Sequence, residues 1–500
     1  MSEGERIYAA KAPFDKHSAD LVLRSSDNVN FRVHKQVLSL VSDFFDSMLS
    51  VPQPTQAESQ DLDVYSGLPL VRVTEKSWTL DRLLRFCYPT ADPEFRTVAH
   101  IRPVLMAAAK YQMDEVISLS EKQLFLLEDS PLHVYALACE FNLENAAKAA
   151  AERCRARAMR PIHGTPGLDG VTAGQIYRLL QFCSQKPASK TAKASAQRTP
   201  SFKFASCVQR QSSVLSCSYA KSKANLLEFK PHAHADMVIL SMDDKQFHVN
   251  RYIVSLAAPS FFDHHRPIAG PSSAGLPVYR FAENSEMTLI LLRLMYPLPE
   301  LGLTDIDVLG AVTAAAVKYN MPKVIETLKR RWTDQLETAP LRVYFTMMRY
   351  GWEREAERAA VLASYTKSDL YVPEMEQASG DAYLRFLFFR LSNRMVVFLL
   401  SKLLLPPGLH RDVAWDKTSL NPLYWRLDCE EYANNADRFV LDVMESVPKR
   451  GWQESCTHVL LALRPSNNRS SSTIRLDEDF LGKLVVFEQK VKRGLQYVKF

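Results

Sequence analysis

The chain contains an internal repeat, and this repeat limits the possible folds more than any other feature of the sequence. Residues 18–46 align without a gap on residues 234–262, and ten of the 29 aligned positions are identical. The identical pairs include Asp20/Asp236, Val22/Val238, Asp27/Asp243, Phe31/Phe247, Val33/Val249, Leu40/Leu256 and Phe45/Phe261. The match resumes after a variable loop and reaches Pro131 in the first copy and Pro340 in the second. The sequence therefore predicts one unit of about 165 residues that occurs twice.

The local patterns in each copy predict a small sheet followed by helices. Two short β-rich runs, 19–24 and 31–34, flank a turn in the first copy, and 237–240 with 247–249 repeat them in the second. Apolar residues at helical spacing follow in both copies, beginning with the run from Val37 to Met48. This order predicts a helix-rich α+β fold with two units, in which helices cover a small sheet and a purely helical extension follows.

Length and charge place the boundaries between these parts. The 500 residues exceed what one core usually organises. Residues 186–227 contain eight Lys and Arg and no Asp or Glu, in a Ser- and Ala-rich context that is typical of a flexible linker. Without this segment the chain has 54 basic and 56 acidic residues. The predicted parts are a tail 1–16, a first domain 17–130, a helical extension 131–185, a basic linker 186–227, a second domain 228–338, a second helical extension 339–404 and a C-terminal region 405–500 of unknown fold.

One ordered set of residues in the first copy has the spacing of a known domain. An Asp, an apolar strand, a turn and an aromatic residue precede the pattern His-Lys-x-x-Leu-x-x-x-Ser-x-x-Phe. The matching residues are Asp20, Phe31, His34, Lys35, Leu38, Ser42, Phe45 and Met48. The first copy therefore resembles a BTB/POZ domain. The second copy resembles it more distantly, since Asn250, Arg251 and Ala258 replace the His, Lys and Ser.

The resemblance extends to the helical segments and implies a function in protein interaction. It covers about 17–185 and 232–390, and the helical extensions are similar to those of the expanded fungal BTB proteins. BTB domains form homo- or heterodimers, and many are substrate adaptors for cullin-type ubiquitin ligases. The resemblance gives six candidate partner-binding residues: Asp20, His34, Lys35, Asp236, Asn250 and Arg251.

Two consequences of the resemblance concern partners. Cullin adaptors usually carry an apolar-x-Glu motif, but here Gln56 stands two positions before Glu58, and 264–276 contains no Glu. This departure weakens the cullin prediction and leaves the dimerisation prediction intact. We expect the two BTB-like units to pair with each other within one chain. The alternative is that the first copy dimerises between chains and the second is a spacer.

No motif in the sequence predicts an enzyme, a cofactor or a metal site. The nucleophile elbow, the phosphate-binding loop and the zinc-protease motif do not occur. Asn250 stands where the first copy has His34, and a catalytic or metal-binding role would not survive that exchange. We therefore expect a non-enzymatic protein in which His34 makes a structural contact.

The remaining expectations concern location and a second class of partner. The first twenty residues carry charges throughout and resemble no signal peptide, which predicts a cytoplasmic or nuclear protein. Residues 382–405 are apolar but include four Arg or Lys, which predicts a buried helix and no membrane contact. A nucleic-acid-associated or transcriptional regulator that uses the basic linker is the alternative function. The dispersed Lys and Arg of that segment favour protein partners over nucleic acid.

Overall fold

The computed structural model describes most of the chain as two compact units. The described residues are 6–50, 64–65, 67–159, 161, 164–184, 203–205, 229–231, 233–268, 275–298, 302–365, 371–401, 447, 485–486 and 488–493. Among the described residues, the first unit takes in those within Met1–Cys207 and Ser379–Leu384, and the second takes in those within Val208–Ala378, Arg385–Lys417 and Leu427–Phe500. Apart from 203–205, the predicted linker lies outside the described residues, as does nearly all of 405–500.

The sheet of the first unit is built around the predicted hairpin. Strands β2 (Leu21–Arg24) and β3 (Val29–Val33) are antiparallel, with Leu23 opposite Phe31. β5 (Leu68–Arg72) pairs in parallel with β2, and β4 (Val64–Tyr65) pairs with β5. β1 (Tyr8–Ala9) pairs with β3 at the other edge, which gives the order β1-β3-β2-β5-β4. The predicted tail 1–16 thus supplies a strand of the folded unit.

The sheet of the second unit has the same central topology. β6 (Met237–Leu240) and β7 (Gln246–Val249) form the hairpin, and β8 (Val278–Arg280) pairs in parallel with β6. Asn28 and Asp244, in the two hairpin turns, both have positive φ, 60° and 58°. Asn and Asp tolerate this left-handed conformation better than most residues, so the same turn forms in both copies.

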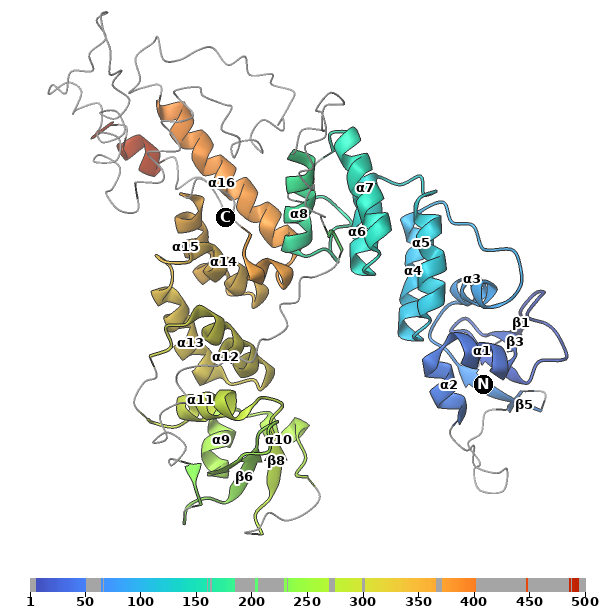
Figure 1. Cartoon of the computed structure of the whole chain (residues 1–500), viewed down its shortest axis with the longest axis horizontal. Coiled ribbons are helices and arrows are strands. Elements are labelled where there is room, and N and C mark those ends of the chain that lie inside the picture. The colour runs from blue at the N-terminus through green and yellow to red at the C-terminus, as the bar shows by residue number, and fades with distance from the viewer. Residues whose placement is uncertain are drawn as a thin grey trace, which may run out of the picture. The chain divides into compact units, whose positions relative to one another are not determined.

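The helices occur in the same order in both units, and many of them form side-by-side pairs such as α4 with α5 and α6 with α7 (Figure 1). The helices of the first unit are α1 (Lys35–Val41), α2 (Asp43–Ser50), α3 (Ser77–Cys87), α4 (Val98–Lys110), α5 (Asp114–Leu124), α6 (Pro131–Glu140), α7 (Glu144–Ala156) and α8 (Ala173–Ser184). The helical run expected from Val37 to Met48 is therefore two helices. Ser42 between them is extended, and its hydroxyl donates to the Tyr111 carbonyl at 2.5 Å.

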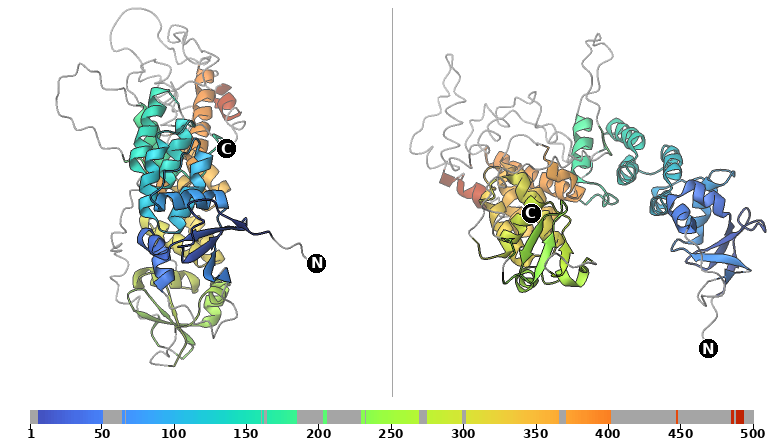
Figure 2. Two further views of the ribbon diagram at one scale, coloured as in Figure 1. Left: turned by 90° about the vertical axis from the view of Figure 1, so that its right-hand side faces the viewer. Right: turned by 60° about the horizontal axis from the view of Figure 1, so that its bottom comes forward.

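The second unit repeats this helical order, and Figure 2 shows its helices from two further directions. They are α9 (Arg251–Ala257), α10 (Phe261–His264), α11 (Ser285–Met295), α12 (Ile306–Lys318), α13 (Pro322–Asp334), α14 (Pro340–Arg349), α15 (Glu353–Ser364), a 3₁₀ helix (Pro373–Glu376) and, from Arg385 onward, α16 (Gly380–Ser401). The prediction of a helix-rich α+β fold is confirmed.

The repeat alignment correctly places the aromatic core residues. Phe45 and Phe261, which the alignment equates, are 2% and 1% exposed. Phe45 stacks on Tyr111 with ring centroids 5.0 Å apart, and Phe261 packs on Tyr319 at 6.0 Å. Both copies therefore bury the same aromatic pair, a phenylalanine of the second helix and a tyrosine that follows a later helix.

The apolar segment 382–405 corresponds largely to α16. Tyr383, Phe386 and Phe389 are buried, and so is Arg390. Among the described residues, no helix combines the length and the apolar character that crossing a bilayer requires.

Candidate interaction surface

The aspartates predicted as partner-binding residues hold the first helix of each unit to the sheet. Asp20 Oδ1 accepts a hydrogen bond from the Lys35 N–H at 2.8 Å, and Asp236 Oδ1 accepts one from the Arg251 N–H at 2.5 Å. Lys35 and Arg251 are the first residues of α1 and α9, where backbone N–H groups lack partners within the helix. Asp20 and Asp236 thus satisfy a helix terminus, while their side chains remain exposed.

His34 and Asn250 occupy the same N-cap position and make different side-chain contacts. The backbone N–H of each donates to a tyrosine hydroxyl at 2.8 Å, Tyr88 in the first unit and Tyr296 in the second. The His34 ring lies 3.2 Å from the Ser18 hydroxyl, whereas Asn250 Oδ1 accepts from two N–H groups of the first turn of α9. Because Asn is a strong N-cap, the exchange of His for Asn adds a side-chain cap to α9 that His34 does not give to α1.

A second polar contact, which the sequence analysis did not identify as functional, holds the helix after the variable loop. Asp27 accepts from the N–H and hydroxyl of Ser77 at 2.7 and 2.6 Å, and Asp243 does the same with Ser285 at 2.6 and 2.7 Å. Burial opposes ionisation of Asp27, but hydrogen bonds from Ser25 and Ser77 outweigh it and lower its pKa. In the sequence, the only indication of this contact is that Asp27 and Asp243 are identical in the two copies.

A third repeated contact joins the end of the sheet to the next helix. Glu75 lies 2.9 Å from the Lys110 ammonium and accepts from the Tyr111 hydroxyl. Glu283 makes the same two contacts with Lys318, at 2.9 Å, and with Tyr319. Burial and the neighbouring carboxylate raise the pKa of both tyrosines. The repeat therefore preserves the polar framework of the unit as well as its core.

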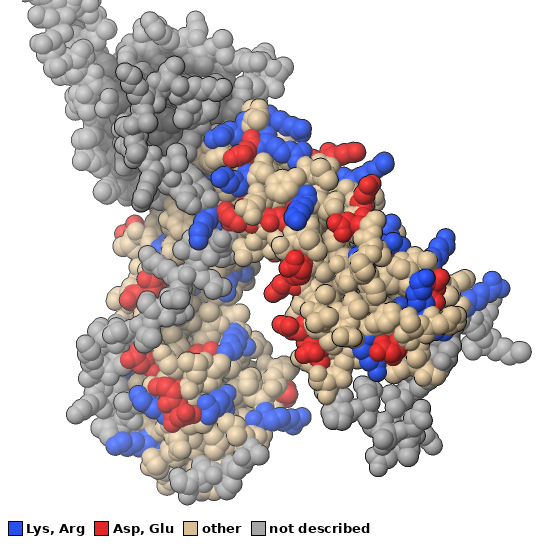
Figure 3. Space-filling model, turned by 45° about the vertical axis from the view of Figure 1, so that its right-hand side comes forward, with Lys and Arg blue, Asp and Glu red and all other residues tan. Residues whose placement is uncertain are grey.

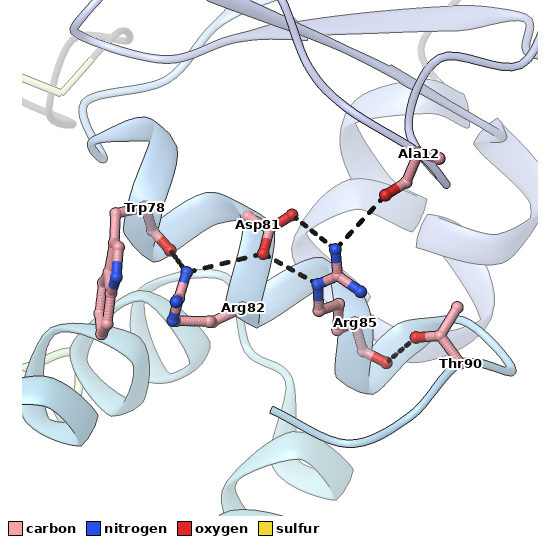
Figure 4. Close-up of polar contacts among 6 residues, drawn as sticks. All are labelled: Ala12, Trp78, Asp81, Arg82, Arg85 and Thr90. Atoms are coloured by element: carbon pink, nitrogen blue, oxygen red, sulfur yellow. Dashed lines mark hydrogen bonds and ion pairs between the residues drawn. The ribbon is translucent and has the colours of Figure 1, made fainter. Parts of the chain in front are cut away.

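The N-terminal segment of the first unit is fixed on α3 by an arginine (Figure 4). Arg85 pairs with Asp81 at 2.9 Å and donates to the Ala12 carbonyl at 3.4 Å. One turn earlier, the Arg82 guanidinium lies 3.9 Å from the centre of the Trp78 ring. The bond from Arg85 to Ala12 and the pairing of β1 with β3 attach residues before 17 to the folded unit.

Large apolar side chains are exposed on the first helices of both units. We define the α1 face as Leu40 of α1 with Phe44 at the start of α2, which are 78% and 40% exposed, and the α9 face as Tyr252 and Leu256 of α9, which are 68% and 61% exposed. Within 18–46 and 234–262, all of which is described, Leu40/Leu256 is the one identical apolar pair that is exposed in both copies. Neither leucine contributes to the core of its own unit.

The comparison with known families agrees with the geometry of the first unit. The model of the BTB/POZ domain matches residues 11–125, from the segment held by Arg85 to the end of α5. The first unit begins with a BTB/POZ domain. BTB/POZ domains are protein-interaction modules, so this part of the chain has the architecture of an interaction domain. No curated protein and no solved structure matched the chain.

Positive and negative side chains are mixed on the face of the molecule that Figure 3 draws. On the face drawn in Figure 3, Lys and Arg lie among Asp and Glu. Such a surface does not steer a polyanion as a single-sign patch would. Within the described part of the chain, no group of three or more His, Cys, Asp or Glu residues could hold a metal ion.

Proposed function

We propose that the chain is a non-catalytic interaction protein with two BTB/POZ-like units, which self-associates through the α1 face and the α9 face. One observation carries the proposal: Leu40 and Leu256, at the same position of the repeat, are 78% and 61% exposed. Burying a leucine side chain contributes about 1.5–3 kcal/mol. Two such residues on a shared interface therefore favour association.

The second unit supports the proposal because its strand order and polar contacts resemble those of the first unit more closely than its sequence does. Its hairpin and parallel third strand follow the order of β3, β2 and β5 in the first unit. Its polar contacts repeat those of the first unit at Asp236, Asp243 and Glu283. We therefore assign it to the same kind of module.

Self-association is favoured because the same exposed leucine occurs at equivalent positions of both units, which suits a contact in which each patch meets its counterpart. Each helix that carries one of these leucines also begins with a cation whose backbone N–H is held by an aspartate, Lys35 by Asp20 in the first unit and Arg251 by Asp236 in the second. Opposite charges of this kind suit a self-complementary interface. Two pairings meet this description: α1 face to α9 face within one chain, and equivalent faces between chains.

Photo-crosslinking tests the proposal and separates the two pairings. We expect benzoylphenylalanine in place of Leu40 to cross-link to peptides that contain Tyr252 or Leu256 if the pairing is internal, and to yield a covalent dimer if it is between chains. Leu126, which follows α5 and is 71% exposed, is the matched control position. Equal cross-linking from positions 40 and 126 would contradict the proposal.

The narrower role of cullin adaptor is left out of the proposal. Its motif position, Glu58, lies outside the described residues, and Gln56 does not fit the motif. The alternative of nucleic-acid binding through 186–227 has a direct test. Several phosphate contacts give a steep fall of log affinity for DNA with log salt concentration, so a flat response would exclude it.

A further inference from the structure

A short piece of the predicted linker is docked on the helical extension of the first unit. Phe204 is 1% exposed and Ala205 is 3% exposed. The Phe204 ring meets Phe182 of α8 edge-on, with centroids 5.2 Å apart, and Tyr135 of α6 at 6.2 Å. The prediction of one continuous flexible linker over 186–227 is therefore wrong at 203–205, because an aromatic side chain there is buried in a pocket of the preceding domain.

The carboxylate of Glu144 holds the backbone donors of this segment. Oε1 accepts from the Phe204 N–H at 2.5 Å, and Oε2 accepts from the Ala205 N–H at 2.9 Å. The two carboxylate oxygens thus bind two successive N–H groups, one each, in a charge-assisted bidentate contact. Glu144 is the first residue of α7, where the helix dipole favours a negative charge.

Two side chains of α8 hold the backbone acceptors. The Arg178 guanidinium donates to the Phe204 carbonyl at 3.2 Å, and the Gln175 amide donates to the Ala205 carbonyl at 3.0 Å. Arg178 and Gln175 are 9% and 3% exposed, so these are buried polar groups. Gln175 is oriented by a reciprocal capping box, in which it exchanges hydrogen bonds with Thr172 at 2.9 and 3.2 Å.

This chemistry is that of peptide recognition. Four of the contacts go to backbone groups, which any peptide supplies, and one aromatic pocket selects the side chain. The second unit keeps part of the arrangement: Glu353 begins α15 as Glu144 begins α7, and it lies 3.6 Å from Arg385 of α16.

We propose that Glu144, Gln175 and Arg178, together with the pocket around Phe182, form a docking site for an extended peptide with Phe followed by a small residue. Residues 203–205 are its resident ligand. They are joined to α8 through residues 185–202, so the site meets its ligand at an effective concentration on the order of millimolar. A weak intrinsic affinity is therefore enough to keep the site occupied. The site is separate from the α1 face and does not depend on the proposed self-association.

A labelled peptide of residues 199–206 tests the proposal by fluorescence anisotropy on the full-length chain. We expect it to bind the Phe204→Ala chain about tenfold or more tightly than the native chain, because the native site is occupied. Glu144→Gln added to Phe204→Ala should weaken binding about tenfold, since a charge-assisted contact is lost. Glu353→Gln is the matched control and should change nothing. Equal affinity for the native and Phe204→Ala chains, or no loss with Glu144→Gln, would overturn the proposal.

Limited trypsin digestion provides a readout that does not require the peptide to bind in trans. Cleavage after Lys203 in the full-length chain should accelerate several-fold in Glu144→Gln and Phe204→Ala, because the segment must leave the site to reach the protease. Cleavage in Glu353→Gln should keep the native rate. Unchanged cleavage at Lys203 in both docking variants would overturn the proposal.

Discussion

Equivalent residues of the two copies are either buried, where they stabilise the unit, or exposed, where they are available for contacts with a partner. Phe45 and Leu40 lie five positions apart and are 2% and 78% exposed. The equivalent residues of the second unit, Phe261 and Leu256, show the same contrast, with 1% and 61% of their surface exposed. Substitutions at the first pair should therefore affect folding, and substitutions at the second should affect association.

The aromatic pair gives the clearest stability prediction. Phe45→Ala and Phe261→Ala should each lower the free energy of unfolding of their own unit by about 3–5 kcal/mol, because each leaves a cavity beside a buried tyrosine. Thermal or denaturant unfolding of the full-length chain measures this. Exposed Leu126→Ala is the control and should cost little. An unchanged transition in either Phe variant would contradict the alignment of the two copies.

The sequence predicted these core residues but could not assign the neighbouring surface. The repeat marks Leu40 and Leu256 as identical, and identity alone does not tell which side of a helix faces the core. Phe44 fitted the helical period of Val37 and Leu38, yet the extended Ser42 separates α1 from α2, and Phe44 is 40% exposed. Because the helix is interrupted at Ser42, residues of α2 do not continue the buried face of α1, and the apolar period of the sequence cannot reveal such an interruption.

Helices are attached to the sheet by polar side chains that lie far away in sequence. Ser77, the first residue of α3, is bound by Asp27, 50 residues earlier, and Ser285 of α11 is bound by Asp243. No local pattern predicts such contacts, since their partners meet only in the folded unit. The hairpins and helices were predictable from periodicity, whereas the joints between them required the tertiary structure.

Asp27 makes the stability of the first unit depend on pH. Burial acts to raise its pKa, but hydrogen bonds from Ser25 and Ser77 lower it below the ordinary 3.8. A lowered folded-state pKa stabilises the fold above pH 3.8, and this stabilisation is lost as the pH falls through 3.8 towards the folded value.

Asp27→Asn should therefore cost about 1 kcal/mol near neutral pH and little at pH values below the folded-state pKa of Asp27. Urea unfolding of the full-length chain at a series of pH values checks this. The control is Asp92→Asn, at an exposed loop position. A native-like stability of Asp27→Asn at neutral pH would show that the carboxylate does not hold α3.

The whole molecule contains two similar units and a short segment, residues 203–205, that is docked on the first of them. The two copies were predictable because self-similarity survives along the chain, but docking at Phe204 was not. A single Phe in a Ser- and Lys-rich segment has no period, and its pocket is made by α6, α7 and α8. The predicted boundaries at 17–130, 228–338 and 339–404 remain predictions.

The molar mass and size of the full-length chain test the central claim, self-association through the α1 and α9 faces, most directly. Light scattering with small-angle X-ray scattering should find either a dimer of the 56.8 kDa chain or a compact monomer. The double variant Leu40→Glu, Leu256→Glu should convert the dimer to a monomer or increase the radius of gyration of the monomer, while Leu126→Glu leaves both unchanged. A double variant with the mass and radius of the native chain would contradict the account.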